Sequence, residues 1–131
     1  MYIEFTDGTQ LECLRILGKP VMYNGTERDT LNIEFTPSDT LDHIRSYFTN
    51  PSNMETLYSR LSDLTPKETI GTGYMILVDA RDESRRIKYA PGEMRPIQYE
   101  NVFVITIAQL TYQEYQDWKN GTGEIPTLYE E

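Results

Sequence analysis

Several short runs of this chain alternate apolar and polar residues, and turn-forming dipeptides separate the runs. Residues 1–5, 9–13 and 30–35 each carry apolar side chains at every second position. A period of two predicts half-buried β-strands, because successive side chains of a strand point to opposite faces. Asp7-Gly8 separates the first two runs, and Asp-Gly in that position indicates a β-hairpin. The sequence therefore predicts a fold rich in antiparallel β-structure.

The first hairpin could close in two registers, and its apolar pattern distinguishes them. A two-residue turn would place Phe5 opposite Gln10, so that core and polar residues would share a face. A three-residue loop, Thr6–Gly8, instead places Ile3 opposite Leu11 and puts the apolar residues of both strands on one face. We therefore predict the three-residue loop, with its glycine in the left-handed backbone conformation.

The remaining strand signals are β-branched or alternating runs bounded by glycine, proline or charged residues. They predict a short strand after a break at 18–20, two strands joined by a charged turn, and one strand with apolar residues on both faces. In that order the predicted strands are Val21–Tyr23, Tyr74–Ala80, Arg85–Ala90 and Val102–Gln109, and the charged turn is Asp82-Glu83-Ser84. The last strand should be central in its sheet because both of its faces are partly apolar.

Two short helices are predicted from capping residues and apolar spacing. Ser38 or Thr40 caps the first helix, whose apolar positions fall at i, i+3 and i+7 and which ends before Pro51. Thr111 and Glu114 have the spacing of a capping box and start the second helix.

One stretch, residues 52–64, is ambiguous. Its apolar spacing favours a helix, and a strand over Thr56–Leu61 is the alternative. Together the elements predict an α+β fold: a mostly antiparallel β-sheet of about six or seven strands, with one or two short helices on a face. Residues 1–123 are predicted to form a single β-rich globular domain, and residues 124–131 an acidic C-terminal tail.

The chain has an excess of acidic residues, which makes some classes of binding partner unsuitable. The formal net charge is −9 at pH 7. Nucleic-acid phosphates and anionic membrane surfaces attract basic proteins, so we expect neither as a partner. The longest apolar runs are too short to form a membrane-spanning helix, and the first residues do not have the pattern of a signal peptide. We therefore expect no secretion by a signal peptide.

Signals for catalysis and metal binding are weak. His43 is the only histidine and Cys13 the only cysteine. His43 falls outside the apolar positions of the first helix and is expected to be exposed, whereas Cys13 lies on the apolar face of its strand and is expected to be buried. Zinc sites need clustered Cys and His, and Gly71-Thr72-Gly73 precedes a strand instead of the helix that follows a phosphate loop. The sequence therefore predicts no enzyme activity, no cofactor and no metal.

Two groups of side chains are candidates for contact with a partner. Tyr112, Tyr115 and Trp118 form an aromatic stripe on the second helix, which either packs against its own sheet or docks a partner. A basic cluster forms either a solvated strand face or a contact for an acidic partner, including an acidic end of another copy of the chain. The members of the basic cluster are Arg81, Arg85, Arg86, Lys88 and Arg95. Residues 101–131 hold five acids and one base, so head-to-tail charge complementarity is available.

Three segments together resemble a family of small proteins encoded in tailed-phage and prophage genomes of Gram-positive bacteria. The segments are Phe5–Thr9 (F-T-D-G-T), Arg28–Phe35 (R-D-T-L-N-I-E-F) and Val104–Glu114 (V-I-T-I-A-Q-L-T-Y-Q-E). The resemblance implies an opening hairpin, strands in place of the helix favoured over 52–64, and a role in a tail or virion. It implies no catalytic residue. The implied location is the bacterial cytoplasm during assembly, or the virion.

The leading hypothesis for function is a non-enzymatic structural or assembly protein of a phage or prophage particle. Its expected partners are other phage structural proteins or further copies of the chain, and the expected contacts are the aromatic stripe together with Arg85, Arg86 and Lys88. The alternative is a small ligand-binding module of the bacterial host, for carbohydrate among other ligands, that uses exposed tyrosines.

Overall fold

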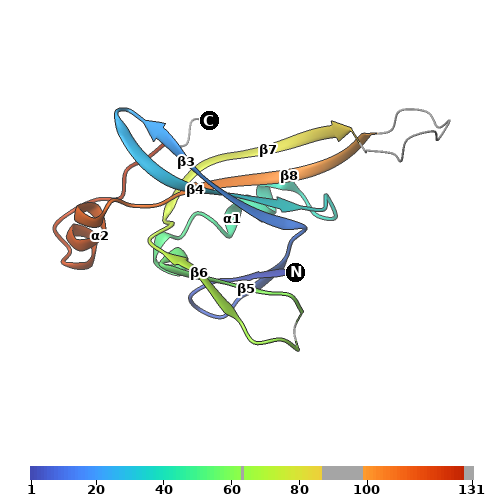
Figure 1. Cartoon of the computed structure of the whole chain (residues 1–131), viewed down its shortest axis with the longest axis horizontal. Helices are drawn as coiled ribbons and strands as arrows, with labels where there is room; N and C mark the ends of the chain where they lie inside the picture. Colours follow the sequence, from blue (N-terminus) through green and yellow to red (C-terminus); the bar gives the residue numbers. More distant parts are fainter. Residues whose placement is uncertain (63, 87–98, 129–131) are drawn as a thin grey trace.

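The computed structural model describes residues 1–62, 64–86 and 99–128, except for the side chains of residues 85, 86 and 99. Within these residues, eight strands form two four-stranded antiparallel sheets, accompanied by two short α-helices and one 3₁₀ helix. Figure 1 shows the two sheets as separate layers, with helix α2 at one end of the molecule. The predicted α+β class with mostly antiparallel strands is confirmed. The strands are divided between two sheets instead of lying in one.

The smaller sheet has the strand order β2-β1-β5-β6. Its strands are β1 (Tyr2–Glu4), β2 (Gln10–Glu12), β5 (Thr56–Arg60) and β6 (Glu68–Thr72). Ile3 lies opposite Leu11, and the backbone N–H of Phe5 donates to the carbonyl of Thr9 at 2.8 Å. Gly8 has a φ of 92°. The three-residue loop and its left-handed glycine are therefore confirmed.

A buried carboxylate ties the strands of the smaller sheet together. Glu4 of β1 is only 4% exposed, and its oxygens accept hydrogen bonds from Gln10 Nε2 at 2.8 Å, Arg60 Nε at 3.0 Å and Lys67 Nζ at 3.0 Å. These bonds, led by the one from Gln10, lower the pKa of Glu4 to about 2. The carboxylate is therefore charged and fully partnered at neutral pH.

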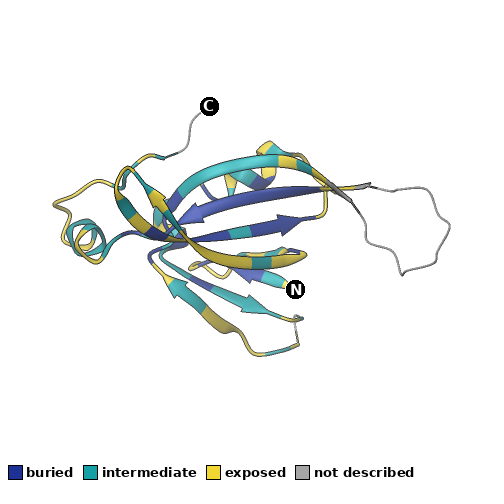
Figure 2. Cartoon of the chain, turned by 45° about the horizontal axis from the view of Figure 1, so that its top comes forward, coloured by how far each residue is buried: buried dark blue, intermediate teal, exposed yellow. Residues whose placement is uncertain are grey.

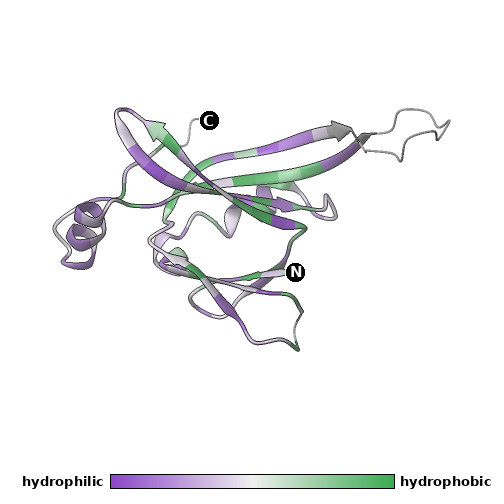
Figure 3. Ribbon diagram, in the orientation of Figure 1, coloured by the Kyte–Doolittle hydropathy of each residue, from purple (hydrophilic) through white to green (hydrophobic). Residues whose placement is uncertain are grey.

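The larger sheet has the strand order β3-β4-β8-β7. Its strands are β3 (Arg15–Tyr23), β4 (Thr26–Phe35), β7 (Ile76–Arg86) and β8 (Tyr99–Ala108). β8 lies between β4 and β7, as predicted for the strand with apolar residues on both faces. Figure 2 shows β4 and β8 largely buried, and Figure 3 shows hydrophobic residues along much of β8.

Two predicted interruptions of the larger sheet are wrong. The break at 18–20 is absent, because β3 runs through Gly18 and Pro20 and pairs with β4 along its length. Proline is tolerated there because β3 is an edge strand, where one row of backbone groups needs no partner. The charged turn at 82–84 is also absent, because these residues pair with 101–103 of β8. β7 is the opposite edge strand, so its charged side chains can reach solvent.

The helix favoured over 52–64 is wrong as well. The chain instead forms the 3₁₀ helix η1 (Pro51–Met54) and then strand β5. β5 lies between β1 and β6, with Ser59 opposite Ile3. Pairing with β1 and β6 gives the backbone N–H and C=O groups of β5 hydrogen-bond partners on both sides. This gain outweighs the local helical spacing, because helix propensity is only a weak preference. Met54 and Leu57, which the helical pattern placed on one face, are both fully buried.

Both predicted α-helices are present. Helix α1 (Leu41–Ser46) begins at Thr40, whose hydroxyl accepts a hydrogen bond from the backbone N–H of His43 at 3.2 Å. Helix α2 (Tyr112–Lys119) begins at Thr111 with a complete capping box to Glu114. Among the described residues, no helix is long and apolar enough to cross a membrane.

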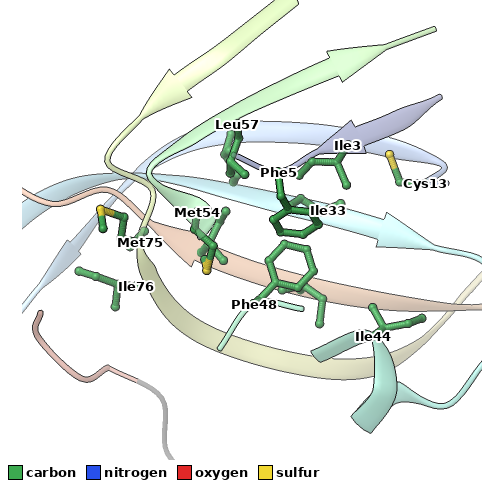
Figure 4. Close-up of a cluster of buried hydrophobic side chains, with 14 of the residues drawn as sticks. Ile3, Phe5, Cys13, Ile33, Ile44, Phe48, Met54, Leu57, Met75 and Ile76 are labelled. Atoms are coloured by element: carbon green, nitrogen blue, oxygen red, sulfur yellow. The ribbon is translucent and has the colours of Figure 1, made fainter. Parts of the chain in front are cut away.

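Buried hydrophobic residues of both sheets and of the α1 region form a single cluster, which Figure 4 shows in close-up. Phe5 and Phe48 pack edge to face at a centroid separation of 5.2 Å. Ile125 and Leu128 are partly buried against this cluster. The described part of the predicted C-terminal tail, residues 124–128, therefore packs on the body of the protein, and residues 129–131 lie outside the described residues.

Candidate functional site

Helix α2 is attached to the rest of the protein by polar contacts and by the partly buried rings of Tyr115 and Trp118. None of its residues is fully buried. Arg28 of β4 holds Glu114 of α2 through two hydrogen bonds, from Nη1 at 2.5 Å and from Nη2 at 2.9 Å. At the next residue of the helix, the hydroxyl of Tyr115 donates to the Glu55 carboxylate at 2.7 Å. The position of α2 therefore depends on the Arg28–Glu114 pair, on the contacts of Tyr115 and Lys119 with Glu55, and on the packing of Tyr115 and Trp118 against the core.

The Arg28–Glu114 pair is strongly shielded from water on the arginine side. Arg28 is 8% exposed, and its Nη1 also donates to the carbonyl of Gln109 at 3.1 Å. Its Nε is a buried donor for which the described part of the chain supplies no acceptor. The hydrogen bonds from Arg28 lower the pKa of Glu114 to about 2, and the same contact raises the pKa of Arg28. Both groups are charged at any physiological pH.

Two adjoining hollows lie beside α2 and share the segment 109–112. The first has a volume of about 400 Å³ and the second of about 340 Å³. The first is lined by Thr72, Gly73, Gln109, Leu110, Thr111, Tyr112, Tyr115 and Gln116. The second is lined by Glu27, Arg28, Asp29 and residues 109–112. We call the two hollows together the α2 groove.

Three segments that are distant in sequence meet at the α2 groove. Gly73 follows β6 with a φ of 92°, a conformation that glycine adopts readily, and its carbonyl accepts a hydrogen bond from the N–H of Leu110 at 2.8 Å. Gln109 directly follows β8, and its backbone N–H donates to the carbonyl of Asp29 at 2.9 Å. The floor of the groove is therefore fixed by backbone hydrogen bonds, and its rim carries the side chains.

The rim of the groove combines an exposed aromatic ring with free carboxylates. Tyr112 is 80% exposed, so most of its side chain is open to solvent. Glu27 and Asp29 are both exposed, and neither forms an ion pair within the described residues. These groups can pack against, hydrogen-bond to and attract a partner that carries positive charge.

The structure divides the predicted aromatic stripe. Tyr112 and Tyr115 line the α2 groove, whereas Trp118 is partly buried against the hydrophobic core and is not part of the groove lining. Tyr115 is partly buried as well, and the rings of Tyr115 and Trp118 lie 6.1 Å apart. Trp118 therefore packs against its own protein core, whereas Tyr112 is exposed and available for contact with a partner.

Of the predicted basic cluster, the structure describes the side chain of Arg81, which does not line the α2 groove. Arg81 is matched by carboxylates of its own strand, at 3.0 Å from Asp79 and 3.0 Å from Glu83. Arg85 and Arg86 form the end of β7, and their side chains lie outside the described set. Lys88 and Arg95 lie outside the described residues altogether.

His43 and Cys13 occupy the environments that the sequence predicts. His43 is exposed and pairs with Asp39 on the first turn of α1. Cys13 is 5% exposed, and burial raises the pKa of its thiol to about 11, so it is a neutral thiol at pH 7. A cavity of about 360 Å³ beside Cys13 is lined by Leu11, Glu12, Leu14, Phe35, Thr36, Ser38, Asp39 and Ile44. No described group of three or more His, Cys, Asp or Glu side chains is placed to hold a metal ion.

Sequence reasoning missed Gln109, Gln116, Glu27 and Asp29 as groove residues. Glu27 and Asp29 flank the arginine of the R-D-T-L segment, and Gln109 belongs to the closing A-Q-L-T-Y-Q-E segment. The co-occurrence of these two segments was the available signal, because the structure joins them through the Arg28–Glu114 pair.

Comparison of the chain with protein-family models, curated proteins and solved structures found no match. The α2 groove is therefore the structural feature from which we propose a function. The groove offers aromatic rings, amide groups and carboxylates, which are groups that suit contact with another molecule through packing, hydrogen bonding and charge.

Proposed function

We propose that this chain is a non-enzymatic structural or assembly protein of a phage or prophage particle, and that it acts through protein–protein contacts at the α2 groove. The observation that carries the contact part of the proposal is Tyr112, whose ring is 80% exposed at the rim of a preformed hollow. Tyrosine is one of the residues that most often dominate the binding energy of protein interfaces. The resemblance to small phage and prophage proteins supports the particle part, and it implies a location in the bacterial cytoplasm during assembly or in the virion.

The way in which the groove is built also supports a contact role. Arg28 and Glu114 fix α2, and backbone hydrogen bonds fix Gly73 and Leu110, so a partner would meet a surface that is already ordered. Because this surface is already ordered, binding does not have to pay the entropy cost of ordering the loops of this chain. The rim carboxylates of Glu27 and Asp29 would speed the encounter with a basic partner.

The proposal is tested by complementation of a phage or prophage from which the gene has been deleted. Wild-type chain should restore infectious particles, whereas Tyr112→Ala should restore few although it folds, because it removes the aromatic anchor. Leu64→Ala is the matched control, since Leu64 is 92% exposed and lies outside the groove. Normal particle yield after deletion of the gene would refute the proposal, as would full complementation by Tyr112→Ala.

The second candidate is a small ligand-binding module, for carbohydrate among other ligands. The observation in its favour is that two tyrosines and two glutamines, Gln109 and Gln116, line one hollow of about 400 Å³. Aromatic faces and side-chain amides can pack on and hydrogen-bond to a sugar. Titration of the protein with bacterial cell-wall oligosaccharides, followed by Tyr112 and Tyr115 ring resonances in NMR, distinguishes the two. Saturable shifts that disappear in Tyr112→Ala would favour this candidate over the first.

A further inference from the structure

A second hollow lies where β2 leads into β3 and β4 leads into α1. It is the cavity of about 360 Å³ beside Cys13, which we call the Cys13 cavity. Its inner wall belongs to the hydrophobic core, because Cys13, Phe35 and Ile44 are all buried members of the core cluster. Figure 4 shows Cys13 and Ile44 at the same edge of that cluster. The Cys13 cavity shares no lining residue with the α2 groove.

The outer part of the Cys13 cavity is apolar as well. Leu14 is 46% exposed and Leu11 is half-buried, and both line the cavity. Small-molecule sites are typically concave and mostly apolar, with volumes of about 300–1,000 Å³. A cavity of about 150 Å³ lined by apolar side chains is large enough to hold benzene. The Cys13 cavity therefore has room for an aromatic ring with a short side chain.

The polar groups at the mouth of the cavity make it acidic. Glu12 and Asp39 line it, together with two hydroxyl residues, and no described lysine or arginine does. The hydrogen bond with His43 lowers the pKa of Asp39, so its carboxylate is charged at neutral pH. Glu12 is exposed and forms no ion pair within the described part of the chain. This mouth repels a ligand that carries a carboxylate and attracts one that carries an ammonium group.

We propose that the Cys13 cavity is a binding site for a small apolar molecule that carries an amine. The apolar part would pack against Cys13, Leu14 and Phe35, where it removes exposed apolar surface from water. The amine would lie at the mouth, beside Glu12 and Asp39. Cys13 contributes a wall and no covalent step, because its thiol is neutral at pH 7. The inference goes beyond the proposed function, since it concerns a different part of the molecule.

Three ligands of similar shape and different charge test the inference by NMR titration of the full chain. They are phenethylamine, phenethyl alcohol and hydrocinnamate, which carry an amine, a hydroxyl and a carboxylate on the same kind of aromatic chain. Phenethylamine should give saturable shifts of the methyl resonances of Leu11, Leu14 and Ile44. It should bind up to about fivefold more tightly than the alcohol, because the mouth charges are partly exposed. Hydrocinnamate should bind more weakly than the alcohol.

Two variants locate the binding and its charge preference. Leu14→Trp should weaken binding of both the amine and the alcohol, because a larger side chain obstructs the cavity. Leu17→Trp is the matched control, since Leu17 is also 46% exposed but does not line the cavity, and it should bind like wild type. Glu12→Gln should reduce the preference for the amine over the alcohol and leave binding of the alcohol unchanged.

The inference is overturned if none of the three ligands gives saturable shifts, or if Leu14→Trp binds phenethylamine as well as Leu17→Trp does. Equal affinity for the amine and the alcohol would also overturn it, because Glu12 and Asp39 would then play no part, and so would equal affinity for hydrocinnamate. Tyr112→Ala should bind phenethylamine like wild type, since Tyr112 does not line this cavity. Failure of this inference and failure of the proposed function are therefore distinguishable.

Discussion

Replacing Glu114 with glutamine should loosen α2 and destabilise the protein. The substitution keeps the shape of the side chain and an oxygen that can accept the capping hydrogen bond from Thr111, but it removes the charge that neutralises Arg28. The guanidinium is then left in a site where Arg28 is 8% exposed, and its acceptors are neutral oxygens, the Gln109 carbonyl and the amide oxygen of residue 114. A buried charge without a counter-charge is costly, because it has given up water without an equal return.

The magnitude follows from the burial of the two partners. Removing one partner of a buried ion pair typically costs about 3–5 kcal/mol. Water reaches part of this pair, since the side chain of Glu114 is 27% exposed, so we expect a loss of about 2 kcal/mol in the free energy of unfolding. The entropy of unfolding of a 131-residue chain is about 0.28 kcal/mol/K, so Tm should fall by about 7 °C.

The assay uses a reporter that the chain already contains. Trp118 is the only tryptophan, and it lies on α2, partly buried against the core. Tryptophan fluorescence therefore reports on the docking of α2, whereas far-UV circular dichroism reports mainly on the sheets. In urea, the two transitions should coincide for wild type and separate for Glu114→Gln, with fluorescence changing first.

Asp117→Asn is the matched control, because it removes one negative charge from the same helix. The Asp117 carboxylate accepts a hydrogen bond from exposed Gln113, so this variant should stay within about 0.5 kcal/mol of wild type. In an Arg28→Met background, Glu114→Gln should cost little, since no charge is stranded. The reasoning fails if Glu114→Gln is as stable as Asp117→Asn and its two transitions coincide.

Three further predictions concern turns, pH and the proposed absence of catalysis. Gly8→Ala should lower the free energy of unfolding measured in urea by about 1 kcal/mol, because Gly8 has a φ of 92°. Gly18→Ala is the control and should cost less, because the φ of Gly18 is not in the left-handed region; equal losses would contradict the prediction. The pKa of Glu4 is lowered to about 2, chiefly by the Gln10 hydrogen bond, so the charged carboxylate stabilises the fold above pH 4.5 and this contribution should disappear as the pH falls from 4.5 to 2. Glu4→Gln should flatten this part of the plot of unfolding free energy against pH, and an unchanged slope would count against the assignment. His43→Ala should fold and complement particle formation fully, and loss of function in a folded variant would speak for a catalytic or specific binding role of His43.

The features that the sequence predicted correctly are set by neighbouring residues. The loop of the first hairpin follows from the positions of Ile3, Leu11 and a glycine, and both helices begin at the predicted hydroxyl caps, Thr40 and Thr111. Local patterns failed where a distant strand decides the outcome. β5 forms because β1 and β6 flank it, and the residues of the predicted turn at 82–84 stay in β7 because β8 continues beside them.

The candidate site was predicted in part for the same reason. Tyr112 and Tyr115 share a helix face, which periodicity reveals, and both line the groove. Other lining residues come from β4, from the end of β6 and from the segment between β8 and α2, and no local pattern indicates that β4 and β6 meet at α2. A helical stripe also does not distinguish a buried from an exposed member, so it placed Trp118 and Tyr112 together although only Tyr112 is largely exposed.

Two of the three segments on which the predicted resemblance to phage proteins rests are joined in the structure, and this explains what their polar residues do. Arg28 begins the R-D-T-L segment and Glu114 closes the T-Y-Q-E segment, and the two form the ion pair that positions α2. Thr111 caps the same helix. Since these residues are engaged in holding the helix, they are poor candidates for chemistry on a substrate. Within Val104–Glu114, Tyr112 and Gln113 are the exposed side chains, and Tyr112 is the one that supplies an aromatic ring to the contact surface that we propose.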